Sequence, residues 1–368
     1  MKLRCDSTRL AAALAVVSRA LTARTTLPVL STVHMEAKAD LLVLTATNLE
    51  LSIQKAVEAE VSLEGAVAVP GRLLTEFTSA VGSEPLEMEL QAPGLRLRLT
   101  SPSYDIEIHG ANSEEFPQVV SPDGGEQVTL PAGRLVEAIA DTLAAASTDE
   151  ARPILTGVRM SARSQWLTLT ATDGYRLAER RVAVDQGGPL TTTVPARTMA
   201  EVSRLFRDAH GSVQVNVAQH GSQVCFRGSE GEISSRVIDG AYPDTARLIP
   251  AAWTTRASLD ATELNRRLRA LVPFAHESAN VVRLAVASGS VGLTATATDV
   301  GSARTEMGAK VSGPETAFAF NARYLLDCLA TAEDQVDLEL QGALAPAVIR
   351  RPATGDYVYL FMPVRYPQ

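Results

Sequence analysis

The chain carries one pattern three times. The motif Leu-Thr-Ala-Thr-Asn at 44–48 returns as Leu-Thr-Ala-Thr-Asp at 169–173 and as Ala-Thr-Ala-Thr-Asp at 295–299, in steps of 125 and 126 residues. Periods of 20–50 residues would predict a solenoid or a propeller, whereas a step of this size is the length of a whole domain. The sequence therefore predicts one domain present three times.

A second motif keeps the same two steps. It reads Val-Pro-Gly-Arg, Val-Pro-Ala-Arg and Phe-Asn-Ala-Arg, and its arginines are Arg72, Arg197 and Arg323. Two separate motifs that hold the same spacing make coincidence a poor explanation, and Pro/Gly-rich stretches mark the joints between copies. We expect domains over residues 1–123, 124–252 and 253–368.

Each copy begins with a helix and continues in strands. Apolar residues at helical spacing predict first helices over 7–23, 131–147 and 260–275, with Ser7 and Asp260 as N-caps. Alternating patterns predict strands, for example over 41–47 and 165–172. A second helix is expected after each arginine motif. A proline near its start is tolerated, because the N–H that proline lacks has no hydrogen-bond partner in the first turn of a helix. These elements predict an α+β fold: three similar domains, each with two helices packed on antiparallel sheets.

The charge pattern favours weak, sequence-neutral contact with duplex DNA. The net charge of −8, from 34 basic and 42 acidic residues, argues against tight binding through overall charge but permits one basic face. Arg72, Arg197 and Arg323 would place positive charge at the same point of every copy. A solvated helix face explains any single arginine equally well, but it does not explain the repetition. Aromatic residues make up only 5% of the chain, so no stacking platform for single strands is expected.

Nothing in the sequence indicates catalysis. The histidines are scattered, and neither a His-Glu-x-x-His motif nor a phosphate-binding Gly-x-x-x-x-Gly-Lys loop occurs. The three cysteines share no metal-ligand spacing, so buried, reduced thiols in a cytoplasmic protein are expected. The longest apolar run, 11–17, is far too short to span a bilayer. We therefore expect no enzyme activity, no catalytic residue, no metal and no cofactor.

Five stretches resemble the bacterial replicative sliding clamp, the beta subunit of DNA polymerase III. They lie at 24–30, 171–178, 239–244, 320–327 and 362–365, and the resemblance extends along essentially the whole chain. It implies the DNA clamp fold and a head-to-tail homodimer that forms a ring around duplex DNA. It also implies a DNA replication processivity factor that tethers the replicative DNA polymerase, the clamp loader and other replication or repair proteins through a short clamp-binding peptide. The alternative is an acidic multi-domain protein-binding scaffold that does not encircle DNA.

The resemblance also assigns residues to three surfaces. The arginines expected to contact DNA are Arg24, Arg72, Arg152, Arg197, Arg204 and Arg323. The residues expected at the dimer interface are Tyr104, Ile106, Leu271 and Phe274. The residues expected to line a partner-peptide pocket between the second and third domains are Leu155, Thr172, Gly174, Tyr175, Arg176, Leu177, Pro243, Arg247, Leu248, Asn321, Tyr324, Leu344, Pro346, Leu360, Met362, Pro363, Val364 and Arg365. Thr245, Ala279 and the last three residues, 366–368, depart from the family pattern around this pocket.

Overall fold

The structure is a computed structural model, and it describes residues 1–22, 26–119, 125–218, 221–297, 299, 301–353 and 355–365. The chain divides into two compact units. One comprises Met1–Gly133 and Arg204–Val237, and the other comprises Arg134–Ser203 and Ile238–Gln368. The division passes through the second copy of the repeat, because its two sheets join different neighbours.

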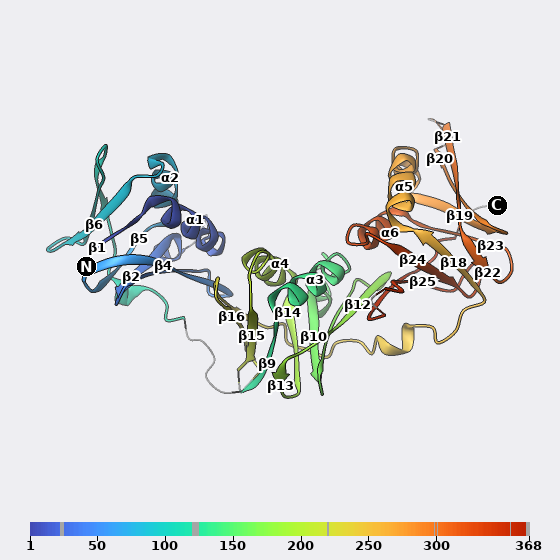
Figure 1. Ribbon diagram of the computed structural model, residues 1–368, viewed down its shortest axis with the longest axis horizontal. Helices are drawn as coiled ribbons and strands as arrows, with labels where there is room; N and C mark the ends of the chain where they lie inside the picture. Colours follow the sequence, from blue (N-terminus) through green and yellow to red (C-terminus); the bar gives the residue numbers. More distant parts are fainter. Residues whose placement is uncertain are drawn as a thin grey trace. The chain divides into compact units, whose positions relative to one another are not determined.

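The first repeat contains helices α1 (Ser7–Val17) and α2 (Gly71–Val81), which pack against each other (Figure 1). Its strands are β1 (Lys2–Asp6), β2 (Thr32–Lys38), β3 (Leu41–Thr47), β4 (Leu51–Leu63), β5 (Gly65–Pro70), β6 (Pro85–Gln91), β7 (Arg96–Thr100) and β8 (Asp105–His109). They form two antiparallel layers, β5-β2-β3-β4 and β1-β6-β7-β8, and the long strand β4 connects them by pairing with β1 as well.

The second repeat follows the same order. Its helices are α3 (Ala132–Leu143) and α4 (Ala196–Leu205), and its strands are β9 (Glu126–Pro131), β10 (Gly157–Arg163), β11 (Trp166–Thr172), β12 (Arg176–Ala183), β13 (Gln186–Gly187), β14 (Leu190–Pro195), β15 (Ser212–Val217), β16 (Gln223–Gly228) and β17 (Gly231–Arg236). One layer runs β14-β10-β11-β12 and the other β9-β15-β16-β17.

The third repeat completes the set, with α5 packed on α6, β20 and β21. Its elements are β18 (Thr255–Asp260), α5 (Ala261–Ala275), β19 (Val281–Ala287), β20 (Ser290–Ala297), β21 (Gly301–Gly308), β22 (Lys310–Ser312), β23 (Thr316–Asn321), α6 (Ala322–Leu329), β24 (Gln335–Leu340), β25 (Ala347–Arg350) and β26 (Tyr357–Phe361). The layers are β23-β19-β20-β21 and β18-β24-β25-β26. The threefold α+β organisation predicted from the repeat is therefore confirmed.

Strand pairing joins neighbouring repeats. In one unit β17 pairs antiparallel with β4, where Ser234 lies opposite Ser52. In the other unit β12 pairs antiparallel with β26, where Leu177 lies opposite Leu360. Each joint is thus a continuous sheet that runs from one repeat into the next, and the backbone groups of both edge strands are satisfied there.

Two of the three predicted first helices were too long at the C-terminal end, whereas the third ends at Ala275 as predicted. The α-helix α1 ends at Val17 because residues 18–20 form a 3₁₀ turn, and α3 ends at Leu143, where Ala145 N donates to Thr142 O at 3.0 Å. The predicted N-cap Ser7 was wrong, since Asp6 accepts the hydrogen bond from Arg9 N at 2.9 Å. The predicted cap Asp260 is confirmed.

A buried charge cluster links the second and third repeats within one unit. Asp141 of α3 lies 2.8 Å from Arg351 Nη1 and 3.5 Å from Arg180 Nε, and the exposed side-chain fractions are 5%, 12% and 5% in that order. The guanidinium of Arg351 also lies 4.0 Å from the ring centroid of Tyr357. Because two cations share one carboxylate away from water, removing that carboxylate would leave both charges uncompensated.

We predict that Asp141→Ala lowers the free energy of unfolding by about 3–5 kcal/mol, because it leaves buried arginine charge without a counter-ion. Urea unfolding followed by circular dichroism measures this change. The matched control is Glu137→Ala on the same helix, which removes an exposed partner of Arg134 at 3.7 Å and should cost less than about 1 kcal/mol. Equal losses in the two variants would contradict the buried-pair argument.

Candidate functional site beside the C-terminal strand

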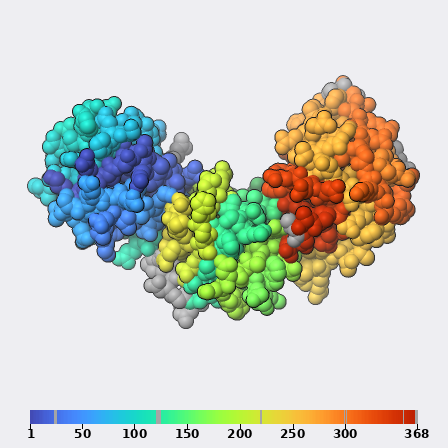
Figure 2. All heavy atoms as spheres, viewed as in Figure 1, coloured from blue at the N-terminus to red at the C-terminus, as the bar shows by residue number. Residues whose placement is uncertain are grey.

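The C-terminal segment lies against two repeats at once. After β26, Met362 N donates to Tyr175 O at 2.8 Å and Val364 N donates to Ala319 O at 2.8 Å. Pro363, which has no N–H, stands between these two donors. In the space-filling view the red C-terminal region adjoins the green surface of the second repeat, in agreement with the pairing of β26 and β12 (Figure 2). The segment therefore brings residues of both repeats to one surface.

A tight turn before β12 presents Tyr175 to solvent. Asp173 Oδ1 accepts hydrogen bonds from Tyr175 N at 2.8 Å and from Arg176 N at 3.0 Å. Thr172 Oγ1 accepts from Gly174 N at 3.1 Å. Gly174 has φ +94°, a conformation that favours glycine, and the turn leaves Tyr175 62% exposed. The carboxylate of Asp173 thus stabilises the turn.

Arg176 is a fixed cation at this surface. Its Nε lies 3.0 Å from Asp173 Oδ2, its Nη1 pairs with Asp327 of α6, and its guanidinium lies 4.9 Å from the ring centroid of Tyr324. Burial opposes the charged form, but Tyr359 and Asp327 outweigh it and raise the pKa of Arg176 above its usual value. Asp327 was missed from the sequence, although its position three residues after Tyr324 puts both on one helix face.

An apolar cluster underlies the same surface. Leu177, Val348 and Leu360 are at most 4% exposed, and Ile249 and Val358 pack against them. Apolar side chains are exposed on the adjoining segments, namely Tyr175, Leu248, Leu344 and Met362. Large apolar groups that are exposed on segments adjoining a buried apolar cluster favour a surface that binds another molecule.

The structure places the predicted pocket residues in three groups. The buried residues are Leu155, Thr172, Leu177 and Leu360. The half-buried residues are Arg176, Asn321, Tyr324, Pro346, Pro363 and Val364. The exposed residues are Gly174, Tyr175, Pro243, Arg247, Leu248, Leu344, Met362 and Arg365. Besides Thr172 and Arg176, two of these residues make contacts within the chain: Asn321 Oδ1 caps α6 by accepting from Arg323 N, and Arg247 Nε lies 2.9 Å from Asp244 Oδ2.

The repeated arginines occupy equivalent helix positions. Arg72, Arg197 and Arg323 are the second residues of α2, α4 and α6, and all three are exposed. Arg72 Nε donates to Glu76 at 2.7 Å, a pair on the helix surface. Arg204 is exposed in the last turn of α4. Equivalent placement of the three repeated side chains, predicted from the spacing, is confirmed.

Two further arginines, Arg152 and Arg24, were predicted to contact DNA. Arg152 is exposed before the short 3₁₀ turn Pro153–Thr156, and its Nη2 donates to Asp173 O at 3.1 Å. It therefore also supports the turn at the candidate partner site. Arg24 lies outside the described residues.

The four residues predicted at a dimer interface differ in exposure. Tyr104 is 44% exposed and meets Phe77 edge to face, with ring centroids 5.9 Å apart. Ile106 on β8 and Phe274 on α5 are half-buried. Leu271 is only 2% exposed, so it belongs to the core of its own unit. Among the four, Tyr104, Ile106 and Phe274 are the residues that can reach a partner.

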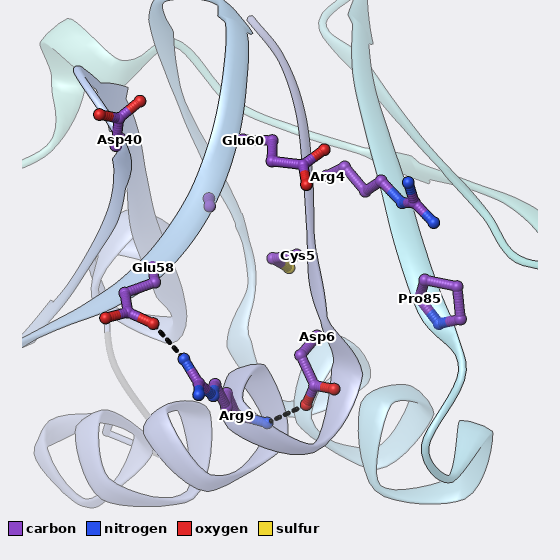
Figure 3. A pocket seen from close by; sticks show the side chains of 9 residues that line it. Arg4, Cys5, Asp6, Arg9, Asp40, Glu58, Glu60 and Pro85 are labelled. Atoms are coloured by element: carbon purple, nitrogen blue, oxygen red, sulfur yellow. Dashed lines mark hydrogen bonds and ion pairs between the residues drawn. The ribbon is translucent and has the colours of Figure 1, made fainter.

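A hollow of about 580 Å³ opens beside β1 in the first repeat (Figure 3). Three of its charged residues are in contact, since the Arg9 side chain pairs with Glu58 and Arg9 N donates to Asp6. Burial raises the pKa of the Cys5 thiol at its inner wall to about 12. This thiol therefore stays protonated at neutral pH and is a poor nucleophile.

All three cysteines are buried, as the sequence predicted, and burial raises the thiol pKa of Cys225 and Cys328 to about 12 as well. Within the described ranges, His, Cys, Asp and Glu side chains do not gather in the threes that a metal ion needs. No helix in that part of the chain combines the length and apolar character required to cross a bilayer.

Three copies of one two-helix domain, joined edge to edge by strand pairing, define the architecture of a sliding clamp. Family models agree along the chain: the N-terminal, central and C-terminal domains of the DNA polymerase III beta subunit match residues 1–120, 129–244 and 246–365. The chain therefore belongs to the DNA polymerase III beta subunit family, the beta sliding clamps. Members of this family are DNA replication processivity factors and not enzymes.

Individual relatives match over nearly their full length. The beta sliding clamp of Synechocystis sp. is 31% identical over 388 residues, 99% of each chain, and that of Staphylococcus aureus is 28% identical over 94% of each. Among solved structures, the DNA polymerase sliding clamp from Bacillus subtilis superposes with a TM-score of 0.93 at 26% identity, covering 100% of both chains. The C. crescentus beta sliding clamp gives 0.92 at 28% identity, covering 100% and 99%.

Proposed function

We propose that two copies of the chain pair head to tail into a ring that encircles duplex DNA in the cytoplasm. The ring slides without sequence preference and tethers the replicative polymerase, the clamp loader and other DNA-processing proteins. The observation that carries this proposal is a pair of unmatched strand edges, one at each end of the threefold repeat.

The unmatched edges follow from the joints. The strand β4 pairs with β17 at the first joint, and its counterpart β12 pairs with β26 at the second. In the third repeat the strand equivalent to β4 and β12 is β21, and in the first repeat the strand equivalent to β17 and β26 is β8. Among the described strands, β21 pairs only with β20 and β8 only with β7. A second copy supplies a β8 for each β21, so two chains complete both pairings and leave neither of these two edges unpaired.

DNA retention then depends on topology. The net charge of −8 disfavours side-on binding to DNA, while the exposed Arg72, Arg197 and Arg323 provide weak phosphate contacts from equivalent helices. Phosphate contacts carry no base information and therefore permit sliding along any sequence. A closed ring needs no strong contact to stay bound.

Partner binding is assigned to the surface beside β26. Its buried leucines and exposed Tyr175, Leu344 and Met362 suit a short peptide with leucine and aromatic anchors. Methionine repacks easily, which fits a site that must accept several sequences. Arg176 and Arg365 provide cations for peptide carboxylates or carbonyls.

We predict that Ile106→Glu with Phe274→Glu converts the dimer into folded monomers, because a buried unpaired charge at an interface costs several kcal/mol. Native mass by analytical ultracentrifugation and far-UV circular dichroism report assembly and folding. Leu63→Glu, at a leucine that is 61% exposed, is the control and should leave the dimer intact. A double variant that still sediments as a dimer at low concentration would place the interface elsewhere.

We predict that Arg72→Gln, Arg197→Gln and Arg323→Gln together weaken direct DNA binding uniformly across sequences. Each lost phosphate contact should reduce the slope of log affinity against log salt by about 0.9. The control is Arg98→Gln on β7, whose guanidinium is paired with Asp105. Binding is measured by anisotropy at several salt concentrations. A change in sequence preference would show base readout and defeat the hypothesis.

Encirclement of DNA can be tested separately from DNA affinity. After loading, wild-type protein should remain on closed circular DNA and dissociate once the circle is linearised. A scaffold that never encircles DNA would show no such dependence.

We predict that deletion from Met362 onward weakens binding of a fluorescent Gln-Leu-x-Leu-Phe peptide at least about tenfold, because a loss of about 1.4 kcal/mol already has that effect. Dimer mass should not change. The matched control removes only residues 366–368. Equal affinities of the truncated and intact proteins, measured by fluorescence anisotropy, would move the partner site to another surface.

A further inference from the structure

The joint between the first and second repeats reproduces the turn of the candidate partner site. Thr47 Oγ1 accepts from Leu49 N at 3.1 Å and donates to Leu51 O at 3.1 Å. Asn48 Oδ1 accepts from Glu50 N at 3.1 Å and from Leu51 N at 2.8 Å. Thr172 and Asp173 make the same four bonds in the other unit.

The strand pairing that follows the turn is also equivalent at the two joints. Arg236 N donates to Glu50 O at 2.9 Å, as Met362 N does to Tyr175 O at 2.8 Å. Ser234 lies opposite Ser52 on the paired strands, as Leu360 lies opposite Leu177. The two joints therefore share one backbone geometry, residue by residue.

A cavity of about 80 Å³ opens at this first joint. Its lining includes Leu49 and Glu50 from the turn, Pro117, and Ser52 and Ser234 from the paired strands. Pro117 follows Phe116 just as Pro243, a predicted lining residue of the partner site, follows Tyr242 one step later. The cavity thus occupies the place in the first joint that the partner site occupies in the second.

The chemistry of the two places is opposite. Ser52 and Ser234 stand where Leu177 and Leu360 form the apolar floor. Strand register also places Gln223 where the second joint has Pro346, since Cys225 pairs with Ser234 as Val348 pairs with Leu360. The Ser52 hydroxyl donates to Thr47 Oγ1 at 2.7 Å and the Ser234 hydroxyl to Glu232 Oε1 at 3.4 Å, so both keep lone pairs that can accept from the N–H groups of a carboxamide. A leucine side chain placed here would desolvate these groups and return no hydrogen bond.

The charges in the cavity lining further restrict the kind of ligand that the cavity can bind. The charged residues in the lining are Glu50 and Arg236, one of each sign. Their balance favours an anchor that is polar but uncharged.

We propose that the joint between the first and second repeats is a second peptide-binding site of reversed polarity. It takes an extended segment anchored by glutamine or asparagine and rejects the leucine-anchored peptide of the other joint. This second site is inferred by comparison with the surface beside β26 and so rests on the proposed function of that surface. In the test below, each of the two sites has its own methyl resonances.

The test is a methyl NMR titration of the full-length dimer with two peptides that differ only in their anchors, leucine or glutamine. The glutamine peptide should shift the methyl resonances of Leu49 and Val119 and leave Met362 unshifted. The leucine peptide should do the reverse. Peptide is added to about 10 mM, where a site with a Kd near 1 mM is largely occupied.

Two variants connect the response to the cavity. Ser234→Leu fills it and should abolish the shifts of Leu49 and Val119 while leaving the response of Met362 to the leucine peptide intact. Ser52→Ala removes one hydroxyl with little change of shape and should weaken the glutamine peptide about fivefold, the worth of one hydrogen bond. Leu360→Ala is the matched control at the other joint, and it should weaken only the leucine peptide.

Two outcomes would overturn the proposal. One is that the glutamine peptide leaves Leu49 and Val119 unshifted at the highest concentration. The other is that the leucine peptide shifts both sites, which would show that polarity does not separate them. A silent Met362 with a responsive Leu49 would support the second site and count against the partner site beside β26.

Discussion

Hydrogen bonding between strand edges is the constraint on which the rest of the structure depends. An edge strand exposes a row of N–H and C=O groups that must be covered or paired. The pairings β4–β17 and β12–β26 satisfy four such edges, two at each joint. The same pairing sets the position of Leu177 against Leu360 and so creates the surface beside the C-terminal strand. Assembly and partner binding therefore rest on one kind of contact.

The two joints differ in what stabilises them beyond the strand pairing. At the second joint, buried Leu177 and Leu360 exclude water, and the nearby Asp141 binds two arginines. At the first joint, Ser52 and Ser234 keep the floor polar, and a small cavity remains. One backbone geometry thus carries two chemical surfaces. Domain repetition supplies the geometry, and substitution at a few facing positions changes what it can bind.

The repeat made much of the fold predictable, because spacing alone locates equivalent elements. The positions of Arg72, Arg197 and Arg323 followed directly from it. The buried ion pair of Asp141 with Arg351 could not be foreseen, since the partners are 210 residues apart and neither lies in a repeated motif. The role of Leu271 could not be predicted for a different reason. An apolar side chain fits a core and an interface equally well, and only the packing in the folded chain distinguishes the two. The cap at Asp6 was missed because Ser7 is an equally good capping residue by type.

The strand pairings at the joints also carry a consequence for the order of folding. Gln54 pairs with Glu232, a separation of 178 residues, and Leu177 pairs with Leu360, a separation of 183. Closing such long loops costs entropy before any contact repays it, whereas the hairpins inside each repeat close over a few residues. We expect the hairpins and helices to form early and the joints to close last. During that interval the open edges β4, β12, β17 and β26 are exposed, and a crowded solution of unfolded chains would aggregate through them.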